Sequence, residues 1–452
     1  MSKAAEGRRL GDLRTPEGVG NLREALHAKA KAEPEFRFYA LYDKLYRADV
    51  LEHAYARCRA NKGAPGVDGL TFEDVARYGP ERWLGELAQT LKDGSYRPKP
   101  IRRVYIPKAN GKMRPLGISC LADRVCMMAA TLILEPIFES DLQPEQYAYR
   151  KGHNAHGALS AVTQGLRDGY TQVVDADLEA YFDSIEHAAL MRSVARRVVD
   201  RRMLALIKSW LECVVEEAGD RGKPRWTTTN RDTGRGIPQG SPLSPLLANL
   251  SMRRVLLGLK QWQKRLGLAA RVVTYADDLV ILCRPGEAHV ALEGLRTITG
   301  KLGLAVNEAK TRICTAQSES FDFLGYTFAR MYSPRTGNPY YGLRPSRKSM
   351  RGVVEELHAI TDRKWTWKET ADVVQQLNRV LRGWANYFSL GTVGNAYRAV
   401  EAYCTQRLWR WLLRKHKQRR SGRVLYPYEY LFETLGLERL SARRSNWPCA
   451  KA

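Results

Sequence analysis

The sequence lacks several features that would place it in a specialised class. None of its eight cysteines stands in a C-x-x-C pair, which excludes a zinc ribbon or a redox motif of that kind. No run of about 18 uncharged apolar residues occurs, which argues against a membrane span. The charged start, MSKAAEGRRL, has no apolar stretch behind it, so no secretory signal is visible. We therefore expect reduced thiols, a cytoplasmic location and no membrane partner.

Acidic residues are also scarce relative to basic ones. The 73 Lys and Arg residues outnumber the 48 Asp and Glu residues and give a net charge of +25. The usual partner of such a surplus is a polyanion, because neutralising phosphates releases counterions. Nucleic acid is the first expectation and an anionic membrane surface the second. The length of 452 residues, with 44% hydrophobic residues, fits two or three globular domains.

The chain divides into four predicted segments. Residues 1–35 are predicted to be an extension of low order with a weak helical stretch at 22–31, and residues 36–330 mix helices with strands. Helices are predicted at 36–61, 72–92 and 123–140, and a basic hairpin at 101–107 and 113–118. Residues 331–425 are predicted to be a helical domain with helices at 346–358, 370–387 and 396–420, and residues 426–452 a short basic segment. Because helices and strands do not alternate strictly, the predicted fold class is α+β.

Two β-branched runs carry carboxylates among apolar residues. They are TQVVDADL at 171–178 and RVVTYADDLVILC at 271–283. Buried carboxylates are costly unless a cation compensates them. If the two strands are neighbours, Asp177 and Asp277 converge, and two hard divalent cations held by carboxylate oxygens would resolve the repulsion. The alternative is a turn in which the Asp side chains cap a helix or bond to the backbone.

Further motifs carry a resemblance to a known family. YADD, DLEAYFDSI (177–185) and RGIPQGSPLSPLLANL (235–250) resemble the palm of a reverse transcriptase, most closely those encoded by bacterial group II introns. In matching order the chain also has GAPGVDG (63–69), IPKANGKMRPLGI (106–118), YAYRKGHNAH (147–156), GLAVNEAKT (303–311) and FDFLGYTF (321–328). The resemblance implies a right-hand polymerase fold, with fingers and palm over 36–330 and an all-helical thumb or maturase domain over 331–425.

The resemblance also implies a metal site and a nucleotide site. Asp177 and Asp277 would be the principal ligands of two Mg²⁺ ions, for which Mn²⁺ could substitute, with Asp278 and the backbone carbonyl of Leu178 contributing. The predicted nucleotide-binding residues are Lys108, Arg114, Phe182, Gln239 and Gly240. Phe182 would be the bulky residue beneath the sugar, where it excludes a 2′-hydroxyl. The alternatives are a core aromatic at Phe182, a solvated basic hairpin at Lys108 and Arg114, and a plain Pro-rich turn at 238–240.

A third set of residues is predicted to contact RNA or primer. Arg150 and Lys151 lie in the stretch that faces the template in the family, and Gly325 lies in FLGY, which resembles the primer-gripping hairpin or else is plain core. RGWANYFSLG (382–391) resembles the maturase-specific segment. After it comes a basic run with no acidic residue, predicted to bind phosphate unless it is a solvated helix face. The RNA-binding residues predicted there are Arg407, Arg410, Arg414, Lys415, Lys417, Arg419 and Arg420.

The expected function is that of an RNA-directed DNA polymerase, a nucleotidyltransferase of the group II intron class. It would use an RNA template with a DNA primer and dNTPs, bind intron RNA to assist splicing, and act on target DNA. Two alternatives stay open, namely a splicing-only RNA-binding maturase and a domesticated reverse transcriptase in DNA repair or phage defence. The bacterial cytoplasm, with the nucleoid during work on DNA, is the expected compartment, and an endonuclease-lacking type is expected. The sequence does not predict the oligomeric state.

Overall fold

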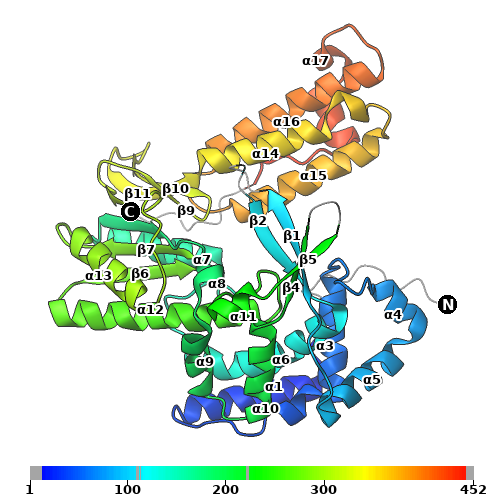
Figure 1. Cartoon of the computed structure of the whole chain (residues 1–452). Helices are drawn as coiled ribbons and strands as arrows, with labels where there is room; N and C mark the ends of the chain where they lie inside the picture. The colour runs from blue at the N-terminus through cyan, green and yellow to red at the C-terminus, as the bar shows by residue number, and fades with distance from the viewer. Residues whose placement is uncertain (1–12, 108–110, 112, 220–222, 444–452) are drawn as a thin grey trace.

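The computed structural model describes residues 13–107, 111, 113–219 and 223–443 (Figure 1). The chain begins with a group of helices that surrounds α6, which is buried along most of its length because it is apolar on nearly every side. These helices are α1 (Glu17–Ala32), α2 (Tyr42–Leu45), α3 (Ala48–Ala60), α4 (Phe72–Tyr78), α5 (Pro80–Asp93) and α6 (Leu121–Glu139). The helix predicted over 72–92 is divided at Gly79, whose φ is 105°, and Pro80 begins the second part.

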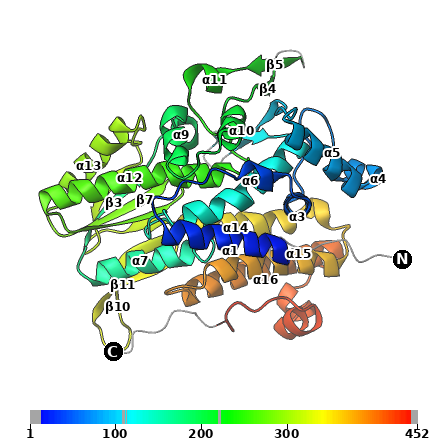
Figure 2. The same cartoon turned by 90° about the horizontal axis from the view of Figure 1, so that it is seen from below.

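The N-terminal segment is more ordered than predicted. Helix α1 buries Val19, Leu26 and Ala30 in the same core as α3 and α6, and Figure 2 shows it alongside α6. Arg23 of α1 donates a hydrogen bond of 2.6 Å to the carboxylate of Glu135 on α6. Residues 17–32 are therefore part of the folded core, so the prediction of low order is wrong for them, whereas residues 1–12 lie outside the described residues.

The central sheet explains why the two carboxylate-bearing runs matter. Its four strands are antiparallel in the order β6-β7-β3-β8. They are β3 (Gln172–Asp177), β6 (Ala270–Tyr275), β7 (Asp278–Cys283) and β8 (Arg312–Thr315). Alternate residues face opposite layers: Val173 packs in a cluster with α7 (Ala155–Arg167), and Val174 packs with α12 (Ser244–Leu266) and α13 (Ala288–Lys301). A sheet covered on both faces is a rigid support for residues at its end.

A second, mixed sheet contains the predicted basic hairpin. Its order is β2-β1-β4-β5, with β1 (Ile101–Pro107), β2 (Met113–Ile118), β4 (Val215–Ala218) and β5 (Pro224–Thr227). Strands β1 and β2 pair antiparallel, which confirms the hairpin, and β1 pairs parallel with β4. The connecting helices are α8 (Tyr181–Ser184), α9 (His187–Ala195), α10 (Arg201–Leu211) and α11 (Thr229–Thr233).

The C-terminal part is a helical bundle entered through a small sheet. Strands β9 (Phe321–Phe323), β10 (Tyr326–Tyr332) and β11 (Pro339–Pro345) form an antiparallel sheet in the order β11-β10-β9. Strand β11 therefore lies in the stretch 331–345, which was assigned to the helical domain without a predicted strand. The bundle contains α14 (Arg347–Ile360), a 3₁₀ turn (Arg363–Trp365), α15 (Thr370–Tyr387), α16 (Gly394–Lys415), α17 (Gly422–Leu425) and a π-helical turn (Tyr430–Thr434). Helix α15 has the predicted bounds.

The core of this bundle extends past the predicted end of the domain. Leu431, Leu437 and Leu440 are buried in the same cluster as Leu377 and Trp411. A boundary at 425 would divide that cluster, so residues 426–440 pack as part of the helical domain. Within the described residues, no helix combines the length and apolar character that a bilayer span requires.

Candidate active site and nucleic-acid interface

The predicted neighbour relation of the two carboxylate-bearing strands is confirmed. Strand β3 pairs antiparallel with β7 so that Asp177 lies directly opposite Asp278. Asp277 lies in the tight turn between β6 and β7, where Ala276 adopts a left-handed conformation with a φ of 57°. The register and this turn bring three carboxylates to one end of the sheet, from sequence positions about 100 residues apart.

The concentration of negative charge is visible at Asp278. Partial removal from water raises the pKa of Asp278 to about 6, although the residue still has solvent contact, and the carboxylates of Asp277 and Asp177 add to the effect. Lys310 lowers this pKa by a smaller amount. This crowding of negative charge favours the binding of a cation.

Lys310 and Asn307 contact the candidate site although neither is among the predicted site residues. The Nζ of Lys310 lies 2.6 Å from Oδ2 of Asp177, and the Asn307 amide donates to the same oxygen at 3.2 Å. The backbone N–H of Asn307 also donates to the Asp177 carbonyl at 2.8 Å. Both residues belong to the GLAVNEAKT motif, so the motif itself was the available signal. This segment holds Asp177 from the side opposite β7.

The oxygen atoms at this end of the sheet are suitable ligands for hard divalent cations. Three carboxylates and the Leu178 carbonyl are oxygen ligands of the kind that Mg²⁺ prefers. Across the described residues, however, no three His, Cys, Asp or Glu side chains are grouped closely enough to hold an ion. Oδ2 of Asp177 is instead paired with Lys310. A cation bound at Asp177 would therefore replace this ammonium group.

Two of the predicted nucleotide-binding elements, Phe182 and the turn at 238–240, lie next to each other. The Ile237 N–H donates to the Phe182 carbonyl at 2.8 Å, so the Pro238–Gln239–Gly240 turn lies next to Phe182. The Phe182 ring is half-buried at the edge of the core. The Gln239 amide reaches Asp183 at 3.5 Å. This placement leaves the Phe182 ring partly accessible, as contact with a nucleotide sugar requires.

Glycine at position 240 is required by contacts within the protein itself. Gly240 has a φ of 108°, and a Cβ there would lie 2.9 Å from the Gly117 carbonyl of β2. The Gly117 N–H in turn donates to the Gln239 carbonyl at 2.7 Å. The close approach is therefore between two backbone segments of the protein. Glycine at this position joins the PQG turn to the basic hairpin.

Of the two basic residues predicted on this hairpin, Arg114 is described and Lys108 lies outside the described residues. Arg114 is exposed on β2. Partial removal from water raises the pKa of Tyr149, Asp277 raises it further and Arg114 lowers it, so both charges act on the same phenol. Tyr149 has a left-handed φ of 59° and a side chain that is 52% exposed. Arg114 and Tyr149 thus lie on the same side as the YADD turn.

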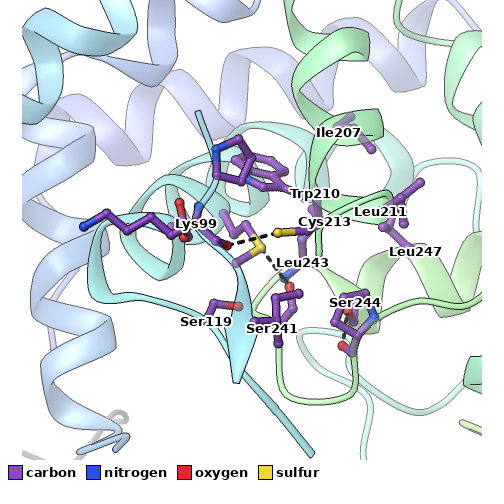
Figure 3. Close-up of a pocket in the computed structure, with 15 residues that line it drawn as sticks. Lys99, Ser119, Ile207, Trp210, Leu211, Cys213, Ser241, Leu243, Ser244 and Leu247 are labelled. Atoms are coloured by element: carbon purple, nitrogen blue, oxygen red, sulfur yellow. Dashed lines mark hydrogen bonds between the residues drawn. The ribbon is translucent and has the colours of Figure 1, made fainter. Parts of the chain in front are cut away.

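A pocket behind the PQG turn contains a buried acid (Figure 3). It is lined by apolar residues of α10, including Trp210, and by Ser244, whose hydroxyl donates to the Pro238 carbonyl at 2.7 Å. Asp123 accepts hydrogen bonds from the Tyr96 hydroxyl at 2.5 Å and the Lys99 N–H at 3.1 Å. Burial raises the pKa of Asp123 to about 6.

Arg150 has a structural role instead of the predicted contact with RNA. Its side chain is 6% exposed and its guanidinium forms an ion pair of 2.6 Å with Glu139. It also donates to the carbonyls of Gln143 at 2.7 Å and Gln146 at 2.8 Å. These partners occupy the groups that would bind phosphate, so the prediction is wrong for Arg150. The neighbouring Lys151 is exposed and stays a candidate.

The FLGY turn connects the palm to the helical domain. Phe323 and Tyr326 are buried core residues, as the alternative interpretation expected, whereas Gly325 lies in the turn with a φ of 77°. The Gly325 carbonyl accepts hydrogen bonds from the first turn of α14. Tyr387 of α15 donates its hydroxyl to the Leu324 carbonyl at 2.8 Å, and burial raises its pKa to about 12. Hydrogen bonds from α14 and α15 of the helical bundle thus fix the turn.

The basic run begins in α16, continues past the end of that helix at Lys415, and divides into two groups. Arg407 is 7% exposed and donates to the side chain and carbonyl of Thr361, each at 3.0 Å, so its predicted role in RNA binding is wrong. Lys415 is half-buried and donates to the Lys368 carbonyl at 2.7 Å. Trp411 is fully buried. The remaining predicted residues are exposed, namely Arg410, Arg414, Lys417, Arg419 and Arg420.

Two family descriptions match the chain. "Reverse transcriptase (RNA-dependent DNA polymerase)" matches residues 106–328, and "Group II intron, maturase-specific domain" matches residues 350–428. The first covers the carboxylate-bearing sheet and the PQG turn, and the second covers the helical bundle. The class defined by these matches and by the paired carboxylates is an RNA-directed DNA polymerase.

Similar proteins agree with this class. The chain is 32% identical to Protein YkfC of Escherichia coli (strain K12), over 70% of this chain and 89% of that protein. It is 27% identical to Group II intron-encoded protein LtrA of Lactococcus lactis subsp. cremoris, over 78% of this chain and 71% of that protein. It is 24% identical to Putative COX1/OXI3 intron 1 protein of Saccharomyces cerevisiae, over 76% of this chain and 49% of that protein. The chain belongs to the group II intron reverse transcriptase and maturase family.

Proposed function

We propose that Asp177, Asp277 and Asp278 form the catalytic centre and hold two Mg²⁺ ions, with Mn²⁺ able to substitute. The observation that carries this proposal is the pairing of Asp177 with Asp278 across β3 and β7, with Asp277 in the adjoining turn. The Leu178 carbonyl would complete the oxygen set. Ions held by these carboxylates would supply positive charge to activate the attacking primer hydroxyl and to stabilise the leaving pyrophosphate. Divalent metal use is general in the reverse transcriptase family.

The residues beside this centre would bind the incoming dNTP. Phe182 would lie beneath the sugar, and its half-buried position with the carbonyl fixed by Ile237 supports this role. Gln239 and Gly240 would contact the nucleotide from the turn that follows. Arg114 would bind the triphosphate through its planar guanidinium, together with Lys108. Lys310 would release Asp177 when a metal ion binds there.

The template strand would be RNA, annealed to a DNA primer, and a second ligand would be the intron RNA. The net charge of +25 and the match to the maturase-specific domain support RNA binding by the helical part. Five exposed cations of the basic run, together with Lys151 and the Gly325 turn, are the proposed contacts. Target DNA would be a further partner. We propose that the protein is located in the bacterial cytoplasm and nucleoid, where both RNA and genomic DNA are present.

The test is primer extension on an RNA template with Mg²⁺. Asp277→Asn keeps the size of the side chain and removes the charge, so DNA synthesis should fall by several orders of magnitude because metal binding weakens. The matched control is Asp43→Asn, which makes the same change at an exposed carboxylate on α2. Activity of Asp277→Asn within several-fold of the Asp43→Asn control would refute the two-metal assignment.

Measuring intron RNA binding alongside primer extension separates RNA binding from DNA synthesis. Asp277→Asn should still bind intron RNA, because the proposed RNA contacts lie on other elements. A wild-type protein that binds intron RNA but extends no primer would support the splicing-only alternative. A wild-type protein that extends primers but binds no intron RNA would support the domesticated polymerase.

A further inference from the structure

The loop between α14 and α15 exposes a tryptophan at the end of the helical bundle. Trp367 is 71% exposed, which places it among the most accessible large apolar side chains of the described residues. Its neighbour Trp365 is half-buried, with the two ring centroids 6.1 Å apart and the planes inclined at 59°. A tryptophan ring in water is unfavourable, and tryptophan is enriched among residues that dominate binding energies.

The loop is braced by the two members of the basic run that do not face solvent. Arg407 is buried beneath it and holds Thr361 through two hydrogen bonds. The ammonium group of Lys415 donates to the carbonyls of Thr366 at 3.4 Å and Lys368 at 2.7 Å. Two cations of α16 thus fix the loop on both sides of Trp365. The exposed ring is presented on a held backbone, which lowers the entropy cost of binding.

The surroundings of the ring are basic. Lys364 and Lys368 lie over the Trp365 ring, 5.3 Å and 4.1 Å from its centroid, and Arg363 is exposed beside them. Arg414 is exposed on the adjacent end of α16, and Figure 1 shows that end next to the α14–α15 connection. Two acidic residues oppose this charge, Asp362 in the loop and Glu369 at the N-cap of α15. Asp362 is already engaged, since its side chain accepts from the Lys364 N–H.

These features select a ligand with phosphate charge and an accessible flat apolar face. An unpaired nucleotide has both, whereas a base inside a duplex has its faces covered by its neighbours. Aromatic stacking on unpaired bases combined with basic residues along the backbone is the usual arrangement for single-stranded RNA. The exposed cations are then placed for phosphates on either side of the stacked base.

We propose that the Trp367 loop, residues 361–368, is a binding site for an unpaired segment of RNA, with the Trp367 ring stacked on one base. The proposal rests on the proposed binding of intron RNA by the helical part. Arg363, Lys364 and Arg414 contact the flanking phosphates. Arg407 and Lys415 do not touch the RNA and position the loop.

The experiment uses the full-length protein with three variants. Trp367→Ala removes the ring, Trp367→Phe keeps a smaller aromatic face, and Tyr39→Ala is the matched control, because Tyr39 is 73% exposed and lies near Glu33 and Glu35 in the chain. The probes are a 12-nucleotide single-stranded RNA, the same sequence as a blunt duplex, and vesicles containing phosphatidylserine. Circular dichroism and primer extension on a pre-annealed template report whether the fold is intact.

Trp367→Ala should weaken single-strand binding by about 5- to 100-fold, the range expected for one stacked base. Trp367→Phe should retain most of the affinity, and Tyr39→Ala all of it. The dependence of affinity on salt should keep its slope in Trp367→Ala, because the ring releases no counterion. Duplex binding and primer extension should be unchanged.

Three results would overturn the proposal. The first is single-strand affinity of Trp367→Ala within twofold of the wild type, and the second is an equal loss on the duplex. The third is wild-type binding to vesicles that Trp367→Ala loses while RNA binding persists, which would assign the surface to lipid. If the wild type binds the single strand but not intron RNA, the proposed function fails and the inference about the loop stands.

Discussion

Replacing Arg150 by methionine separates a structural role from a role in RNA binding. Methionine keeps the apolar stem and removes a guanidinium that pairs with Glu139 and donates to two backbone carbonyls. The carbonyls of Gln143 and Gln146 lose their charged donor, and the Glu139 carboxylate loses its cation. No other change to the surface charge of this region is introduced.

The size of the effect follows from the burial of the partners. Breaking a buried ion pair by removing one partner costs about 3 to 5 kcal/mol. The Glu139 side chain is 25% exposed, so water can recover part of its solvation and the lower end of that range applies. At about 2 °C per kcal/mol for a large domain, a loss of about 3 kcal/mol lowers the unfolding midpoint by about 6 °C.

The assay is thermal unfolding combined with a salt titration of RNA binding. Lys151→Met is the matched control, since it removes a basic charge from the next residue, whose side chain is exposed. Its stability should change by less than about 0.5 kcal/mol. In Arg150→Met the slope of log affinity against log salt should stay unchanged. Unaltered stability with a slope reduced by about 0.7 to 0.9 would refute the structural role and restore a phosphate contact.

Two further predictions concern the proposed nucleotide site and the pocket that contains Asp123. Phe182→Val should raise incorporation of rNTPs relative to dNTPs by roughly tenfold or more, because the space for a 2′-hydroxyl opens, and an unchanged ratio of kcat/KM values in an active variant would make Phe182 a core residue. The raised pKa of Asp123, about 6, means that its contribution to stability is full below pH 4 and is lost as the pH rises through 6. The free energy of unfolding in urea should therefore rise by about 3 kcal/mol for Asp123→Asn relative to the wild type as the pH goes from 4 to 7. A difference between the two proteins that does not change with pH would contradict this.

The three carboxylates of the proposed catalytic centre could be predicted from the sequence because each lies at the end of a β-branched run within a motif of fixed spacing. Strand pairing then confirms that Asp177 and Asp278 meet. The position of the basic hairpin and the bounds of α15 could be predicted for the same reason, since their signals are local. Lys310 could have been added, because it precedes by two residues a strand that pairs with β3.

The errors arise where the partner is distant in sequence. Nothing near Arg407 indicates that Thr361, 46 residues away, will accept its hydrogen bonds. The three buried residues of α1 are too few to predict a core helix, and their burial depends on α6, about 100 residues later. Strand β11 was not predicted because the sequence after 330 is rich in Arg and Trp, although Gly337 indicates the turn of a hairpin.

The strand order of the central sheet has a consequence for synthesis on the ribosome. Strand β3 sits between β7 and β8, so neither of its neighbours exists when it leaves the exit tunnel. At about 5 to 20 residues per second, roughly 5 to 20 s pass before β7 is available. During this interval the two faces of β3 and the apolar helix α6 have only part of their final partners. We expect the nascent chain to depend on chaperones until about residue 315 has emerged, after which the sheet can close in one step.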